Sequence, residues 1–100
     1  MDKETNDALR AHIPYVAPPN LLVITRGIAA LGPEAVREIL QEVKEFNDFS
    51  VDNDPWEEHD FGSFSYQSEE SGKKIFWKID DYAGQEGYDL VLTVMLAEEY

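Results

Sequence analysis

The chain has 100 residues, the length of one domain, and we expect a single acidic domain over residues 1–100. It carries 21 Asp and Glu residues against 8 Lys and Arg, a formal net charge of -13, which argues against direct binding to nucleic acid or to an anionic membrane. It has no cysteine, which excludes disulfides, thiolate metal sites and a cysteine nucleophile, and which fits a reducing cytosol.

The first elements along the chain are a short helix and a strand. Residues 2–12 can form a helix, because Leu9 and Ile13 give them a thin apolar stripe and a proline follows. This segment lacks the apolar run of a signal peptide, and nowhere does the chain approach the ~20 apolar residues of a membrane span, so we expect a cytoplasmic protein. Residues 20–26 are rich in apolar and β-branched side chains and predict a strand that is covered on both faces.

A long amphipathic helix is predicted over residues 33–47. It starts with Pro33, whose missing N–H costs nothing in a first helical turn. Its apolar residues recur at the spacing of one helix face, which predicts that this face packs against the rest of the core. They are Val36, Ile39, Leu40, Val43 and Phe46.

The remaining elements are strands. Residues 61–67 and 73–82 alternate in polarity and predict a hairpin joined by a turn at 68–72, preceded by a loop at 50–60. Residues 90–97 are apolar on both faces, which predicts a central strand. The order α-β-α-β-β-β predicts an α+β fold, with two helices packed on a four-stranded, mostly antiparallel sheet.

Three stretches resemble a family that has no settled biochemical role. They are DNDPWEEHDFGSF at 52–64, FWKIDDY at 76–82 and MLAEEY at 95–100. Together they are similar to a bacterial domain-of-unknown-function family of small proteins, often associated with plasmids or prophages. The resemblance covers about residues 20–100 and departs at Asp81, where members tend to have Tyr. The resemblance implies one fold over the full chain. It implies no activity, and no functional residue of the family can be assigned to this sequence.

An acidic loop is the first candidate site. Its acids are Asp52, Asp54, Glu57, Glu58 and Asp60. A calcium loop of the EF-hand type would need a ligand and then a glycine where Trp56 and Glu57 stand, and His59 has no second His or Cys at zinc-ligand spacing. We therefore predict no metal and no cofactor as the favoured interpretation. The readings left open are a hard-metal site, catalytic carboxylates, partner binding, and a structural loop whose aspartates bond to turn amides.

Four glutamates of the predicted helix are the second candidate site. They are Glu34, Glu38, Glu42 and Glu45. At ~100° per residue they point within about 80° of one another, and a four-residue rise of ~6 Å is close to the spacing of successive phosphates along a nucleic-acid strand. Such a helix can imitate a nucleic-acid backbone. The alternative is a solvated face, with Arg37 and Lys44 offsetting part of the repulsion.

Exposed aromatic residues are a third feature, either interface anchors or fillers at the edge of the core. They are Tyr15, Trp56, Tyr82, Tyr88 and Tyr100. The sequence has neither a G-x-G-x-x-G nor a G-x-S-x-G motif, and its serines and histidines stand at no recognised catalytic spacing.

These observations favour a non-enzymatic module whose two acidic sites bind a basic protein. The sharper form of the hypothesis is a nucleic-acid mimic of the anti-CRISPR or anti-restriction type, which blocks the DNA- or RNA-binding surface of a defence complex. Two alternatives stay open: a small metal-dependent hydrolase that uses the loop from Asp52 to Asp60, and a soluble oligomerisation domain.

Overall fold

The structure, a computed structural model, describes residues 3–50, 54, 57–67 and 72–100. It contains one four-stranded sheet in the order β1-β4-β3-β2, in which β1 runs parallel to β4 and the other pairs are antiparallel. The strands are β1 (Leu21–Ile24), β2 (Phe61–Gln67), β3 (Gly72–Asp81) and β4 (Leu90–Leu96). The predicted α+β fold, with its mostly antiparallel sheet, is confirmed.

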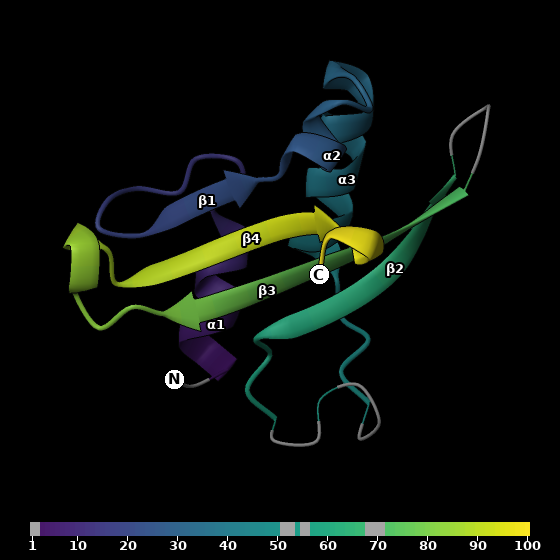
Figure 1. Cartoon of the computed structure of the whole chain (residues 1–100). Coiled ribbons are helices and arrows are strands. Elements are labelled where there is room, and N and C mark those ends of the chain that lie inside the picture. Colours follow the sequence, from purple (N-terminus) through teal and green to yellow (C-terminus); the bar gives the residue numbers. More distant parts are fainter. Residues whose placement is uncertain (1–2, 51–53, 55–56, 68–71) are drawn as a thin grey trace.

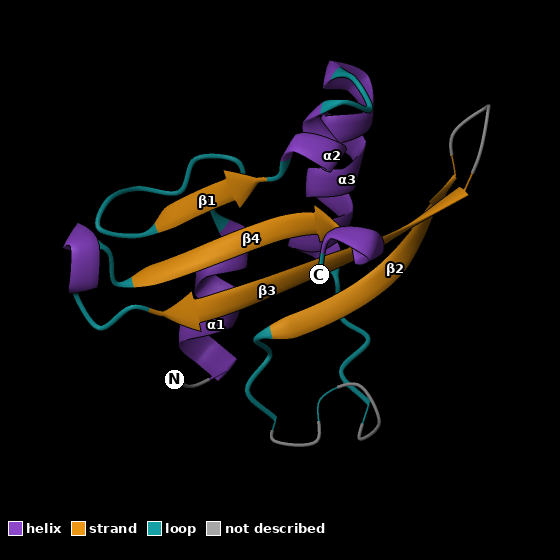
Figure 2. Cartoon of the chain, viewed as in Figure 1, coloured by secondary structure: helices purple, strands orange, loops and turns teal. Residues whose placement is uncertain are grey.

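Helices cover one face of this sheet and leave the other open (Figures 1 and 2). They are α1 (Lys3–Ala11), α2 (Arg26–Ala29) and α3 (Pro33–Glu45), with the 3-10 turns η1 (Gln85–Gly87) and η2 (Ala97–Glu99). In the view of Figure 1, α1 and α3 lie behind the sheet, and η2 turns back on the near side. None of the helices in the described part of the chain has the length and apolar character needed to cross a bilayer.

The core forms where α3 meets the centre of the sheet. Trp77 of β3 is fully buried and pairs in register with Val94 of β4, so both point toward the helices. Ile39 and Val43 of α3 are fully buried as well, as the period of the helix predicted. Each fully buried aliphatic side chain of this kind stabilises the fold by roughly 1.5–3 kcal/mol.

Several details differ from the sequence predictions. A third helix, α2, follows β1 directly and buries Ile28 completely. Strand β1 was expected to be covered on both faces, but this was wrong, because it is an edge strand whose residues are only half-buried. The two-sided apolar strand β4 is central, as predicted. Helix α3 ends at Glu45 instead of residue 47, since Phe46 leaves helical geometry with ψ 130°. Most of the predicted turn, residues 68–71, lies outside the described residues.

Candidate functional site

The acidic face of α3, consisting of Glu34, Glu38, Glu42 and Glu45, is the first candidate site. All four residues are exposed. Partial burial, followed by repulsion from Glu38 and Glu45, raises the pKa of Glu42 above its usual value. The carboxylates therefore act on one another, as the helical spacing predicted.

Tyr66 of β2 extends this face onto the sheet. Its hydroxyl donates a hydrogen bond to a Glu38 carboxylate oxygen at 2.7 Å. This bond raises the pKa of Tyr66 the most, and burial and the charges of Glu38, Glu34 and Glu42 add to it. The acidic face thus lies on the β2 side of α3. The alternation of residues 61–67 predicted Tyr66 on one strand face with Phe64, but no local pattern linked it to a glutamate 28 residues earlier.

No ion pair neutralises the acidic face within the described part of the chain. Arg37 and Lys44, which were expected to offset its charge, form no ion pair with the described residues. The carboxylates that do form ion pairs there are Asp7, Asp54, Asp80 and Glu98. Glu45 only accepts a hydrogen bond from the Gln41 amide, at 3.0 Å. The negative charge of this face is left for solvent or for a partner.

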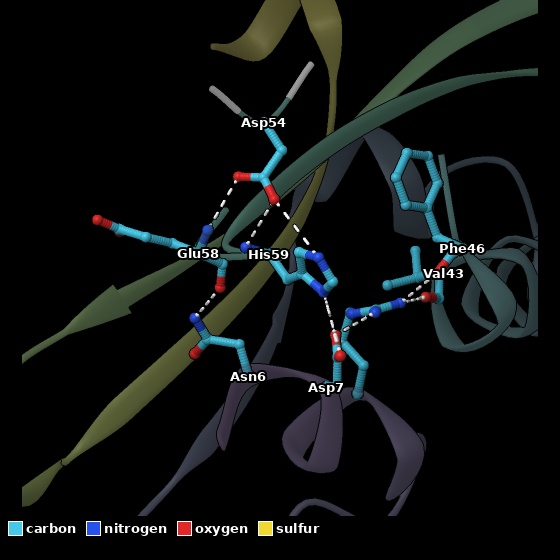
Figure 3. A network of polar contacts seen from close by, with 8 residues as sticks. Asn6, Asp7, Val43, Phe46, Asp54, Glu58 and His59 are labelled. Carbon is cyan, nitrogen blue, oxygen red and sulfur yellow. Dashed lines mark hydrogen bonds and ion pairs between the residues drawn. The ribbon is translucent and has the colours of Figure 1, made fainter. Parts of the chain in front are cut away.

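The second candidate site, the loop before β2, is built around Asp54 (Figure 3). Asp54 is only 6% exposed, and its carboxylate accepts the backbone N–H groups of Glu58 at 3.1 Å and His59 at 3.2 Å. A buried carboxylate in this position satisfies loop amides that would otherwise lack partners. Asp54 therefore stabilises the loop by accepting these backbone hydrogen bonds.

His59 is held from both sides in the same loop. Its ring stacks on Phe49 with centroids 3.6 Å apart. Its Nδ1 lies 2.9 Å from an Asp7 carboxylate oxygen, and its Nε2 lies 3.5 Å from Asp54. Burial pushes the pKa of Asp7 upward, but the hydrogen bonds and charges of His59 and Arg10 outweigh burial and lower it. Because both ring nitrogens face carboxylates, the ring offers no free nitrogen to a metal or a substrate.

Helix α1 supplies the other half of this network. Buried Arg10 donates through Nη1 to the carbonyls of Val43 and Phe46, both at 2.9 Å, and so caps the C-terminal end of α3. Its guanidinium also lies over the ring of Trp77, 4.9 Å from the centroid. The Asn6 amide donates to the Glu58 carbonyl at 2.8 Å. The sequence predicted only the apolar stripe of α1 and not these polar contacts, because Glu58, Val43 and Phe46 lie more than 30 positions away from the α1 residues that bind them.

The remaining loop acids form a cluster of their own. Glu57 is exposed and adopts a positive φ of 54°, and Glu58 is half-buried. Burial, and then the charge of Glu58, raises the pKa of Asp60, with a smaller effect from Asp54. Asp52 lies outside the described residues. Within the described ranges, no three His, Cys, Asp or Glu side chains are grouped so that they could hold a metal ion.

Fold and charge thus define a small acidic α+β protein with a carboxylate-rich helix. The chain belongs to the family described as protein of unknown function (DUF3768), whose model matches residues 24–99, more than half of the chain. This confirms the predicted membership of a domain-of-unknown-function family. Neither the curated proteins nor the solved structures contain a match to the chain.

Proposed function

We propose that this protein is a non-enzymatic acidic module that binds a basic partner protein through the acidic face of α3. The observation that carries the proposal is that four exposed carboxylates share one helix face and repel one another, and that none is in an ion pair with the described residues. A basic surface would relieve that repulsion on binding. Opposite fields also speed association when they are not screened by salt.

The sharper form of this proposal is nucleic-acid mimicry. The carboxylates of α3 follow one another by about one helical turn, a rise of ~6 Å between residues four apart, which is close to the repeat of phosphates along a strand. The partner would then be a nucleic-acid-binding protein, for example a defence complex, whose DNA or RNA groove the acidic face occupies. An inhibitor of the anti-CRISPR or anti-restriction type would work in this way.

A binding titration with the partner, captured from the native host, tests the proposal. Glu38→Gln/Glu42→Gln keeps the acceptor for the Tyr66 hydroxyl and removes two charges, so it should weaken binding at least tenfold at low salt. Glu4→Gln/Glu86→Gln removes the same charge from exposed positions outside α3 and is the matched control. Equal affinities of the two double variants would refute the role of the acidic face.

Salt and DNA separate mimicry from a simple ionic interface. Raising the ionic strength from about 0.05 to 0.3 M shortens the screening length to below ~8 Å and should slow association in either case. Double-stranded DNA or RNA should displace the protein only if both occupy one groove. Salt-sensitive binding without competition would support the acidic module and overturn the mimicry.

A further inference from the structure

A second site adjoins the acidic face of α3, and one of its lining residues, Gln41, donates a hydrogen bond to Glu45 of that face. An open pocket of about 540 Å³ is formed by the connection between α1 and β1, the end of β1, α2 and the first half of α3. Its volume is within the roughly 300–1,000 Å³ range of small-molecule sites. A protein has few pockets of that size, so in a chain of 100 residues this one is a candidate ligand site.

The wall of the pocket is almost entirely apolar. Ile13 and Leu40 are buried at its floor, and Ile24 and Val36 are half-buried beside them. Two prolines, Pro14 and Pro33, also line it, and their fixed φ angles make this part of the wall stiff. Exposed apolar surface that is concave and preformed favours an apolar ligand, since little conformational entropy is lost when it binds.

Among the described residues that line the pocket, Arg37 is the only charged one. It is exposed and forms neither a hydrogen bond nor an ion pair with the described residues. Glu38, although next to it in sequence, points to the β2 side, where Tyr66 binds it. At ~100° per residue, Lys44 lies within about 20° of Arg37 on the helix and adds a second cation to the pocket side. Both cations thus flank the acidic face instead of opposing it, with Arg37 about 60° from Glu34 around the helix.

The beginning of α3 does not add to this positive character. Pro33, which lines the pocket, is the first residue of the helix, and Glu34 already places a carboxylate in the first turn. The partial positive charge at this end of the helix therefore has an anion beside it, and Arg37 is the group left to receive the carboxylate of a ligand. Arg37 is a planar donor that can hold a carboxylate through two parallel hydrogen bonds.

From the apolar wall and the unpaired cation in its lining, we propose that this pocket binds a small amphipathic acid, with an alkyl or other apolar body against Ile13, Ile24 and Leu40 and a carboxylate on Arg37. The proposal is independent of the function of the acidic face. Because the whole chain has a net charge of -13, a free anion is repelled at long range, and both the apolar contacts and Arg37 are required for binding.

The test uses three probes of equal chain length on the intact protein: decanoate, decan-1-ol and decyltrimethylammonium, each below the concentration at which it forms micelles. Calorimetry gives the affinities, and amide chemical shifts locate the site. Decanoate should bind most tightly and shift the signals of Ala29, Val36 and Leu40. Octanoate should bind more weakly, by about fourfold for each buried methylene that it lacks.

Variants assign the roles of the lining residues. Arg37→Gln should weaken decanoate about tenfold or more and change decan-1-ol by less than about twofold, because only the acid uses the charge-assisted contact. Lys44→Gln removes the same charge from the same side of the helix outside the lining and should change both affinities little. Ala29→Leu fills the pocket from an exposed position and should weaken both ligands. The acidic-face variant Glu38→Gln/Glu42→Gln should bind decanoate as well as the unmodified protein.

Four results would overturn the proposal: no decanoate binding at millimolar concentration, tighter binding of the cationic probe, shifts centred on the open face of the sheet, or equal effects of Arg37→Gln and Lys44→Gln. Thermal melts check that each variant is folded. Since both cations are exposed and unpaired with the described residues, neither substitution should lower the melting temperature by more than about 2 °C.

Discussion

Gly62 is the position at which one added methyl group should disturb the core most directly. It lies opposite Trp77 in the pairing of β2 with β3. A Cβ at this position would stand 2.4 Å from Trp77 Nε1 and 2.8 Å from Cε1 of Phe46. Trp77 has no room to move away, because it is fully buried and its ring packs edge-on against Phe46 at 5.4 Å. Gly62→Ala must therefore displace an aromatic ring.

The expected loss of stability follows from two opposing terms. Overpacking of a dense core costs about 1–3 kcal/mol. Replacing glycine with alanine restricts the unfolded chain and returns about 0.4–1 kcal/mol. The net destabilisation is about 1.3 kcal/mol from the central values, within a range of about 0–2.6 kcal/mol, and the central value corresponds to a fall of roughly 5–10 °C in the melting temperature of a domain of this size.

Chemical denaturation with Gly72→Ala as the control measures this effect. At Gly72 the new Cβ would meet only the flexible end of the Gln67 side chain, at 2.8 Å, so that substitution should cost less than about 0.5 kcal/mol. Trp77→Phe removes the two Trp77 atoms closest to the new methyl group, so Gly62→Ala should cost less in that background. A Gly62→Ala protein as stable as the Gly72→Ala protein would refute the close packing of Trp77 on β2.

Three further predictions concern the polar contacts that hold the ends of the elements. Arg10→Met leaves the last carbonyls of α3 without their buried donor, and it should cost about 2–5 kcal/mol in urea titrations; a loss below 1 kcal/mol would contradict the capping role. Stability should rise as the pH falls from 7 toward the ordinary aspartate range, because the raised pKa of Asp60 lets the folded state bind a proton before the unfolded chain does, and it should fall at lower pH as Asp7, whose pKa is lowered, is protonated in turn. Melts from pH 7 down to about pH 2 check both limbs, and Asp7→Asn should flatten the acidic one. Glu99→Gln should lower the melting temperature more than Glu98→Gln, because only Glu99 binds the Thr25 hydroxyl and the N–H groups of Gly27 and Leu96; equal shifts would show that this contact does not stabilise the fold.

The hairpin and the main helix could be predicted from the sequence because each has a local period. Strand β2 has the predicted bounds, and β3 begins and ends one residue earlier than predicted. The side chains of Ile75, Trp77 and Ile79 alternate onto the buried face as expected. A hydrophobic period of 2 residues in a strand, or of 3.6 residues in a helix, shows which side of the element faces the core. This side can be predicted without knowing which other element packs against it.

The parallel pairing of β1, by contrast, is a tertiary feature. The sequence of an apolar four-residue strand does not show whether the strand lies in the middle or at the edge of a sheet. The position of β1 is set by its pairing with β4, which lies 70 residues later in the chain. Helix α2 was missed for a related reason. Its four residues are too few to show a period, and they are stabilised by the burial of Ile28.

The features of the candidate sites are likewise of two kinds: those that follow from local residue spacing and those that depend on tertiary contacts. That four glutamates share one face of α3 could be predicted from the sequence, since it follows from helix geometry alone. The folded chain was needed to show that Tyr66 joins this face, that Asp54 and His59 are bound by loop and α1 groups, and that unpaired Arg37 borders an apolar pocket. Each of these depends on a contact between segments far apart in the chain. Residue spacing reports the direction in which a side chain points, and folding supplies the groups that it meets there.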